Sequence, residues 1–398
     1  MSSYKYSVYN SAKRNRPGRG RGQNAGGKRR GQYINPARFV AAAKPAPVNE
    51  QAIKHNFDDF DIDSRLKANL ASKGFVTPSP IQDQSIPLAL GGHDVIGLAN
   101  TGTGKTAAFA VPVLQALFGR QQAKALIVAP TRELAQQIEQ EFRSIGKGGN
   151  FSGALLIGGT GMGPQLRDLR RRPRLVIGTP GRIKDHIERG TLKLESFNIV
   201  VLDEVDRMLD MGFVNDVRSI LDRLAPQRQS LFFSATMDPR VQGLIRTFAK
   251  DPQTVSVQSG ESSDHVNQDV VRYSGTHDKM DKLHDILIKQ EVAKVIVFDE
   301  TQRSVERLGK ELVARGFPAD SIHGGKTQGQ RKRALQGFKD SQTTVLVATD
   351  VAARGIDVAD ITHVINYSLP QSYQDYTHRI GRAGRAGRVG HALTFVQR

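Results

Sequence analysis

Short apolar runs alternate with amphipathic stretches from about residue 93 onward, and this alternation constrains the fold more than any other feature of the chain. The runs are continuous and rich in Val, Ile and Leu, which is typical of strands buried on both faces of a sheet. Between them lie stretches of helical periodicity such as Glu133–Ile145 and Val214–Leu224. Strands that alternate with helices predict βαβ units and a parallel sheet. The first series of apolar runs is Val95–Leu98, Ala125–Val128, Leu155–Ile157, Leu175–Ile177, Ile199–Leu202 and Leu231–Phe233.

The polar segment Val257–Asn267 interrupts this rhythm, and a second series of apolar runs follows it. We therefore predict an α/β protein with two tandem parallel-sheet domains, residues 50–256 and 268–398, joined by a linker over 257–267. Open α/β sheets bind ligands beyond the carboxyl ends of their strands, so motifs at strand ends carry the most weight. The second series is Val270–Tyr273, Val295–Phe298, Val345–Ala348, His363–Ile365 and Ala392–Val396.

The positive charge is concentrated at the N-terminus. The 398 residues contain 57 Lys or Arg and 39 Asp or Glu, which gives a net charge of +18. Residues 1–49 hold 11 of the basic residues and no acid, which leaves 46 against 39 for the rest, a net +7. This Gly- and Arg-rich tail is predicted to be disordered, because it cannot bury enough apolar surface to offset its ordering entropy. Its charge pattern is typical of arms that bind RNA phosphates, or else of a tail that only solubilises the chain.

Composition excludes several classes of protein. The chain has no cysteine, so disulfides, thiolate zinc sites and cysteine nucleophiles are impossible. No run approaches the roughly 20 apolar residues that a membrane span requires. The N-terminal residues also lack the apolar stretch of a signal peptide. We therefore expect a cytoplasmic protein with no membrane partner.

A phosphate-binding loop follows the first predicted strand. Residues 99–106, Ala-Asn-Thr-Gly-Thr-Gly-Lys-Thr, match a Walker A loop with Ala in place of the first Gly. Glycines let backbone N–H groups curl around a triphosphate, and the start of the following helix adds partial positive charge. Lys105 is expected to reach the β- and γ-phosphates, and the Thr106 hydroxyl to bind Mg²⁺.

An acidic turn follows the strand Ile199–Leu202, with the sequence Asp-Glu-Val-Asp over residues 203–206. An acidic pair at a strand end after a P-loop is typical of a Walker B site. Asp203 offers the hard oxygen ligand that Mg²⁺ prefers. Glu204 is expected to orient and deprotonate the attacking water.

Three further strand ends and one arginine cluster complete the pattern. Residues 130–133 and 179–182 combine a Thr hydroxyl, an Arg and a helix start, which favours either a grip on phosphates or simple helix capping. Ser234-Ala235-Thr236 gives little information alone. In residues 378–385, His-Arg-Ile-Gly-Arg-Ala-Gly-Arg, arginines recur every three residues. Such arginines, presented by a second domain, are suited to stabilise phosphoryl transfer as fingers in cis, although a solvated basic patch is the alternative.

Taken together, these motifs resemble the DEAD-box family of ATP-dependent RNA helicases, within helicase superfamily 2. The resemblance spans roughly residues 57–396 and preserves the family's order of motifs, including a Q motif over residues 74–82. It implies two RecA-like domains and an enzyme that hydrolyses ATP with Mg²⁺ to unwind or remodel short RNA duplexes and RNA–protein complexes. Closure of the two domains on ATP and RNA is the implied mechanism, with contacts mostly to the RNA backbone.

The resemblance also implies roles for individual residues. Gln82 selects adenine, Asp357 approaches the ribose, and His378 links the domain interface to the motif at 234–236. Nucleotide contacts fall on Phe57, Gln82, Ala99, Asn100, Thr101, Gly102, Thr103, Gly104, Lys105, Thr106, Asp203 and Asp357, and Mg²⁺ ligands on Thr106 and Asp203. Catalytic roles fall on Lys105, Glu204, His378, Arg382 and Arg385, and coupling of hydrolysis to strand separation on Asp206, Ser234 and Thr236. RNA contacts fall on Pro130, Thr131, Arg132, Gly159, Thr179, Gly181, Arg182, Arg331 and Thr349.

The sequence departs from the family pattern at three places. Val205 replaces the Ala of the name-giving motif, so the motif reads DEVD. Asp299 and Glu300 stand where relatives commonly carry uncharged residues, next to an expected RNA contact. The chain also stops at Arg398 without a C-terminal recognition domain, so substrate targeting is expected to come from the N-terminal arm or a partner.

Three other functions compete with this one. A DNA-directed motor of the same superfamily shares the Walker motifs, but the Q motif argues against it. An RNA clamp uses domain closure without turnover, and Glu204→Gln separates it from a helicase, because a clamp keeps its activity. A structural scaffold requires a degenerate ATP site, which the sequence does not have.

Overall fold

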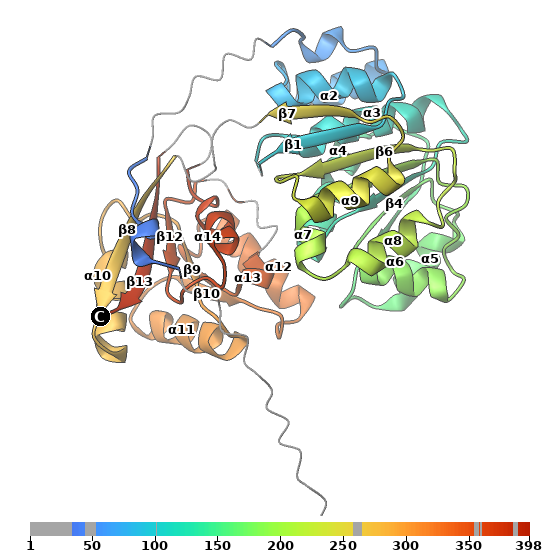
Figure 1. The fold of residues 1–398 in the computed structure, drawn as a ribbon. Helices are drawn as coiled ribbons and strands as arrows, with labels where there is room; N and C mark the ends of the chain where they lie inside the picture. Colours follow the sequence, from blue (N-terminus) through green and yellow to red (C-terminus); the bar gives the residue numbers. More distant parts are fainter. Residues whose placement is uncertain are drawn as a thin grey trace, which may run out of the picture.

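The computed structural model describes residues 34–43, 53–100, 102–257, 265–353, 358, 360–384 and 389–398. In these residues the chain forms two α/β domains that lie side by side, with α12, α13 and α14 of the second domain turned toward α7 of the first (Figure 1). The prediction of two tandem parallel-sheet domains is confirmed.

The first described domain contains a seven-stranded parallel sheet in the order β3-β4-β2-β5-β6-β1-β7. Its elements are η2 (Phe57–Asp59), α1 (Ser64–Ser72), α2 (Pro80–Leu90), β1 (Val95–Ala99), α3 (Lys105–Gly119), β2 (Ala125–Val128), α4 (Arg132–Ile145), β3 (Gly153–Leu156), α5 (Met162–Arg170), β4 (Leu175–Gly178), α6 (Pro180–Glu188), β5 (Ile199–Leu202), α7 (Val205–Asp210), α8 (Val214–Leu221), β6 (Gln229–Ser234), α9 (Pro239–Phe248) and β7 (Gln253–Val257).

The second described domain contains a six-stranded parallel sheet in the order β10-β11-β9-β12-β13-β8. Its elements are η1 (Pro36–Phe39), β8 (Val266–Tyr273), α10 (Thr276–Leu287), β9 (Val295–Phe298), α11 (Gln302–Ala314), β10 (Ala319–Ile322), α12 (Gln328–Lys339), β11 (Val345–Ala348), α13 (Asp350–Ala353), β12 (His363–Asn366), α14 (Tyr373–Ile380) and β13 (Gly390–Gln397).

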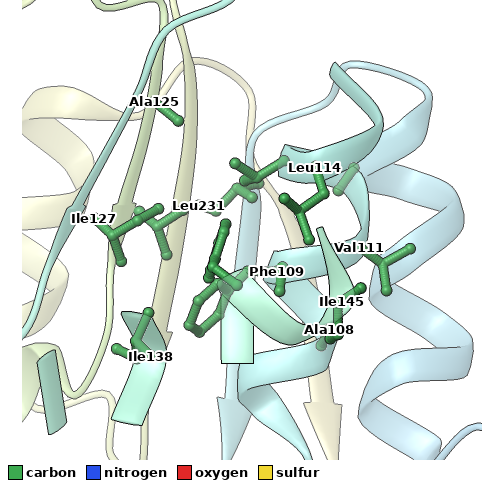
Figure 2. Packing of buried hydrophobic residues seen from close by; sticks show 14 of the residues in the cluster. Ala108, Phe109, Val111, Leu114, Ala125, Ile127, Ile138, Ile145 and Leu231 are labelled. Carbon is green, nitrogen blue, oxygen red and sulfur yellow. The ribbon is translucent and has the colours of Figure 1, made fainter. Parts of the chain in front are cut away.

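Each sheet buries both faces, as the continuous apolar strands require. In the first domain Val95 and Ala99 of β1 point into one cluster of buried residues, and Ile96 and Leu98 point into a second cluster on the opposite face. Figure 2 shows the first cluster, where Phe109 of α3 packs between the central strands and α4. Packing on both faces fixes the strands in the sheet. Because the strands are parallel, the motifs that follow them lie at the same rim of the sheet.

The strands that the sequence did not reveal lie at sheet edges. β7 and β10 are outermost in their sheets, and each carries polar residues because only part of an edge strand is covered. β8 begins at Val266, so residues 266 and 267 belong to a strand rather than to the predicted linker. Full-length pairing of β8 with β13 explains this early start.

Residues 34–43, which we call the strap, correct the predicted disordered tail. The strap is ordered and packs on the second domain, although the first domain follows it in the sequence (Figure 1). Asn35 caps η1 with Pro36 at its first position, a helix-start signal that the sequence analysis overlooked. Phe39 is fully buried in the core of the second domain. The rest of the predicted tail lies outside the described residues.

Candidate nucleotide and RNA site

The phosphate-binding loop joins β1 to α3, and its geometry depends on Gly104. This residue is the N-cap of α3 with φ of +91°, a conformation that glycine adopts without strain. A Cβ built at this position lies 2.4 Å from Nε2 of Gln82, so a larger residue does not fit. Lys105 is buried and its Nζ donates a hydrogen bond to the carbonyl oxygen of Ala99 at 2.9 Å. The lysine therefore folds back over the loop that it follows.

The Q motif braces this loop from the side. The Gln82 Nε2 donates to the carbonyl oxygen of Gly104 at 3.0 Å, and its Oε1 accepts from the backbone N–H of Ser79 at 2.8 Å. The Ser79 hydroxyl donates to the carbonyl oxygen of Thr103 at 2.8 Å. Gln82 thus connects the start of α2 to the phosphate loop, and its expected role in reading adenine stays a prediction.

Phe57, a predicted nucleotide contact, lies behind another aromatic residue. Phe57 is buried in the core of the first domain and meets Phe75 edge-on, with ring centroids 5.4 Å apart. Phe75, which the sequence analysis did not single out, lines the nucleotide cavity itself. In this structure Phe57 supports the cavity wall through Phe75.

The acidic turn follows β5 and places its carboxylates beside the phosphate loop. Asp203 and Glu204 are both buried and line the same cavity as Lys105. Burial raises the pKa of Asp203, with nearby Glu204 adding to the shift and Lys105 opposing it. Burial also acts to raise the pKa of Glu204, but the ion pair with Arg207 and the charges of Lys105 and Arg382 outweigh it, so this pKa is lowered. Glu204 is therefore held as a carboxylate.

Arg207 is a second residue of this site that the sequence did not reveal. Glu204 is the N-cap of α7 with a left-handed φ of +53°, and Arg207 lies three residues later on the same helix. An acid and an arginine three residues apart at a helix start are expected to pair, so this spacing was the available signal. Val205 between them is fully buried in the core.

Asp206 connects the acidic turn to the segment after β6. Its Oδ2 accepts hydrogen bonds from the backbone N–H of Ala235 at 3.1 Å, the N–H of Thr236 at 3.0 Å and the Thr236 hydroxyl at 3.2 Å. The backbone N–H of Asp206 also donates to the Ser234 hydroxyl at 3.3 Å. The structure thus brings together the three residues predicted to couple hydrolysis to strand separation.

The second domain contributes an arginine to the same cavity. Arg382 follows α14, is buried, and lines a cavity of about 400 Å³ together with Gln82, Lys105, Asp203 and Glu204. The other residues lining it are Phe75, Gly102, Gly104, Thr106, Ala107, Leu134, Gln137, Gln140, Glu141 and Lys339. Lys105 of the first domain and Arg382 of the second thus line one cavity.

The neighbouring residues of α14 fix this arrangement. His378 lines a smaller adjoining cavity with Asn100, Asp206 and Arg207. Arg379 is buried and grips Asp350 with two hydrogen bonds of 2.6 and 2.7 Å, and it also donates to the carbonyl oxygen of Ser368. The predicted site residues Thr101, Asp357 and Arg385 lie outside the described residues.

The predicted RNA contacts of the first domain follow three adjacent strands. Pro130 and Thr131 follow β2, Gly159 follows β3, and Thr179 and Gly181 follow β4, and these strands are neighbours in the order β3-β4-β2. Parallel strands therefore collect them at one rim.

Two arginines of this group lie against the turn after β3. A Cβ built on Gly159 lies 2.0 Å from an Arg132 guanidinium nitrogen, so the guanidinium packs on that backbone. Arg182 donates to the carbonyl oxygen of Thr160 at 3.4 Å. Both arginines are half-buried.

Arg331 of the second domain pairs with the first domain. Its guanidinium lies 2.9 Å from a carboxylate oxygen of Glu133, and both side chains are buried. Gln328 on the same helix donates to Gln136 Oε1 at 3.1 Å. Arg331 thus forms an interdomain ion pair in this structure, and its contact with RNA stays a prediction. Thr349, after β11, is buried at the carboxyl rim of the second sheet. Asp299, at the end of the neighbouring β9, accepts from the N–H of Glu300 at 2.8 Å.

The first domain is a parallel-sheet P-loop domain, and an arginine from the second domain completes its cavity. This arrangement is typical of two-domain motors that hydrolyse nucleotides. Residues 79–244 match the DEAD/DEAH box helicase model, and residues 278–387 match the helicase conserved C-terminal domain model. The ATP-dependent RNA helicase CshA of Limosilactobacillus reuteri is 44% identical over 336 residues, which cover 84% of this chain and 67% of that protein. The chain belongs to the DEAD-box helicase family.

Several solved structures also resemble this chain. A DEAD box protein from Methanococcus jannaschii is 37% identical, with 86% of this chain and 93% of that chain covered and a TM-score of 0.51. S. cerevisiae Dbp5 bound to RNA and ADP BeF3 is 28% identical, with 87% and 90% covered and a TM-score of 0.75. The more identical of the two chains therefore has the lower TM-score.

Among the described residues, no helix combines the length and the apolar character that crossing a membrane requires.

Proposed function

We propose that this protein is an ATP-dependent RNA helicase that hydrolyses ATP to unwind or remodel short RNA duplexes and RNA–protein complexes. The observation that carries the proposal is the shared cavity: Lys105, Asp203 and Glu204 come from the first domain and Arg382 from the second. A phosphoryl-transfer site that is complete only when two domains meet couples hydrolysis to domain closure.

In the proposed reaction, backbone N–H groups of the loop and Lys105 hold the triphosphate. Glu204, held as a carboxylate beside Arg207, accepts the proton of the water that attacks the γ-phosphorus. Arg382 stabilises the negative charge that spreads over the transferred phosphoryl oxygens. Product release then leaves the arginine without its anionic partner, which favours reopening.

The residues present fit a magnesium ion. Asp203 is a buried carboxylate, burial raises its pKa, and Thr106 lines the same cavity. Hard oxygen donors are the ligands that Mg²⁺ prefers. Thr106 and Asp203 would hold the ion, which would neutralise charge on the phosphates.

RNA is proposed to bind along the rim that carries Thr131, Gly159 and Thr179, continuing onto the second domain near Thr349. Hydroxyls, backbone N–H groups and arginines suit phosphates and 2′-hydroxyls rather than base edges, so binding is expected to be weakly sequence-specific. The basic tail adds sequence-independent affinity, and the cytoplasm is the proposed location.

The test compares ATP hydrolysis with RNA duplex, with DNA duplex of the same sequence, and with neither. The proposal expects stimulation by RNA above that by DNA, and equal stimulation by both would contradict it. A non-hydrolysable ATP analogue should also raise the affinity for RNA. RNA should raise the affinity for the analogue by the same factor, because coupling between two sites is reciprocal.

The contribution of the tail requires a truncation that spares the strap. Removing residues 1–33 deletes nine of the 11 basic residues counted in the tail and leaves Phe39 in place. We expect weaker RNA binding and a flatter dependence of log K on log salt, since each neutralised phosphate adds to that slope. Unchanged affinity and slope would show that the tail has no role in RNA binding.

A further inference from the structure

The strap joins the second domain through a continuous set of contacts on one helix. Phe39 inserts its ring against Tyr376 of α14, with centroids 4.7 Å apart. The Arg38 guanidinium lies 3.9 Å from the ring centroid of Tyr373, one turn earlier on α14. Phe39 also belongs to the buried cluster that contains Ile380 and Ala383. These two residues flank Gly381 and Arg382 in the sequence.

Backbone pairing fixes the strap in register. Ala41 and Gln268 of β8 form an antiparallel bridge, with N···O distances of 3.1 and 2.7 Å. The N–H of Ala43 donates to the Asn267 Oδ1 at 2.8 Å. The side chain of Gln268 in turn accepts a hydrogen bond from the Tyr376 hydroxyl at 2.9 Å. The strap backbone, β8 and α14 are thus linked in one network.

The strap and the active site lie on opposite faces of α14. Tyr373, Tyr376 and Ile380 are spaced by three and four residues and face the core with Phe39. Gln374 and His378 lie on the other face, toward the first domain. Gln374 Nε2 donates to Asp210 of α7 at 3.3 Å. Removal of Phe39 would therefore leave a hole directly behind the helix that aims Arg382.

The strap is also covalently tied to the first domain. Ten Cα–Cα steps separate Ala43 from Ile53, which span at most about 36 Å when fully extended. Eight steps separate Val257 from His265, at most about 29 Å. With the strap docked, two separate lengths of chain connect the domains, and both limit how far the domains part.

We propose that the strap is a positioning and tethering element of the catalytic cycle: Phe39 holds α14 so that Arg382 meets the γ-phosphate, and the docked strap restricts the open state of the two domains. Phe39 is a positioning residue, since it acts through α14 and touches no substrate. This inference rests on the proposed function, because it concerns the arginine of that same phosphoryl-transfer site.

The positioning part is tested in the full chain with three variants. Phe39→Ala removes the ring, Phe39→Leu keeps an apolar side chain, and Val40→Ala is the control, because Val40 is 53% exposed on the same strap. RNA-stimulated kcat and the affinity for an ATP analogue in the absence of RNA are measured for each.

We expect Phe39→Ala to lower kcat about 10- to 100-fold, the range that a displacement of about 1 Å of a catalytic group produces. The affinity for the analogue should change less than about twofold, because the first domain holds the phosphates. Phe39→Leu should restore most of kcat, and Val40→Ala should match the wild type. A wild-type kcat in Phe39→Ala, or equal losses of kcat and analogue affinity in it, would overturn the inference.

The tethering part is tested by inserting 20 Gly and Ser residues after Ala46, which leaves the docked residues untouched. A connection three times as long lowers the effective concentration of one domain at the other at most about fivefold, because that concentration falls as the −3/2 power of the length. We expect the RNA concentration for half-maximal hydrolysis to rise by up to that factor, while kcat at saturating RNA stays the same.

Dyes report the domain separation directly. Because the chain contains no cysteine, Glu188→Cys and Val313→Cys provide one labelling site on each domain. The insertion should shift the ligand-free distribution to longer distances, and an unchanged distribution would refute the tether. A wild-type chain without RNA-stimulated hydrolysis would instead refute the proposed function, so the two failures are distinct.

Discussion

The two domains share an architecture but divide the chemistry by charge. The carboxyl rim of the first sheet buries carboxylates, with Asp203, Glu204 and Asp206 following β5. The corresponding rim of the second domain presents guanidinium groups, with Arg331, Arg379 and Arg382 buried around α12 and α14. Glu204 and Arg379 each pair within their own domain, with Arg207 and Asp350, whereas Arg331 pairs across the domain boundary with Glu133.

This division of charge predicts that turnover needs both domains. The first domain carries the phosphate loop, the proposed proton acceptor and the proposed metal ligands, so we expect it to bind nucleotide by itself. The second domain brings positive charge to the transition state only when the cleft is closed. Substitutions in the two domains should therefore separate binding from rate.

Among the substitutions, Arg382→Ala in the second domain is expected to lower the rate of ATP hydrolysis the most. Loss of an arginine finger lowers phosphoryl transfer by about 10³–10⁵ where it has been measured, so RNA-stimulated kcat should fall within that range. ATP affinity of the first domain should change little. Steady-state hydrolysis and equilibrium nucleotide binding check this, with Lys310→Ala, an exposed cation of the same domain, as control. A large loss of affinity with little change in kcat would reverse the division of labour.

Glu204→Gln in the first domain should give the next largest effect. Removing a general base lowers the rate by about 10²–10⁴, while the amide keeps the shape of the carboxylate. RNA binding in the presence of ATP should persist, so that the variant forms a complex that does not turn over. Rapid-quench hydrolysis and RNA binding are the measurements, and the exposed Glu188→Gln is the control. Multiple-turnover unwinding by Glu204→Gln would contradict the role of Glu204 as the general base.

Asp206→Ala tests the link between the acidic turn and the segment after β6. The carboxylate accepts three hydrogen bonds from Ala235 and Thr236, and loss of bonds to a charged group costs about 1.5–3 kcal/mol of unfolding free energy. We also expect fewer base pairs opened per ATP hydrolysed. Thr236→Val, which removes a single side-chain bond, should cost about 1 kcal/mol. Urea unfolding and paired unwinding and hydrolysis assays compare the two variants, and equal behaviour would contradict the link.

The smallest effect concerns pH and the second domain. Burial lowers the pKa of His363 to about 4, and the stacked His391 and Lys289 add to this while Glu291 opposes it. An unfolded histidine titrates near 6.5, so between these values the unfolded chain binds more protons than the folded chain. Unfolding free energy should therefore fall as pH drops from about 6.5 toward 4, by on the order of 2 kcal/mol at pH 5.

Urea unfolding followed by circular dichroism at pH 7.5 and pH 5 provides the measurement. His363→Gln should lose most of this pH dependence, while variants of the first domain should keep it. An identical pH profile in wild type and His363→Gln would exclude this histidine as the cause.

Much of the fold and site could be predicted from sequence because buried parallel strands are continuous apolar runs and their motifs follow directly. The central strands and the acidic turn at 203–206 belong to this group. Edge strands such as β7 and β10 carry mixed residues, so no run marks them. The sequence alone did not tell which of Phe57 and Phe75 lines the cavity, because this depends on how the two rings pack. Phe39 was hidden for a different reason: it belongs to a Gly- and Arg-rich tail, and its contacts lie more than 200 residues away in the sequence.

The burial of Phe39 has a consequence for how this chain can be divided. The core of the carboxy-terminal lobe is incomplete without a side chain encoded ahead of the amino-terminal lobe. A fragment that begins after the interdomain linker would expose the rings of Tyr373 and Tyr376 and the unpaired edge of β8, a surface prone to aggregation. Gene fusions or recombinants that exchange this lobe at the linker would inherit the same defect unless they also carried residues 34–43.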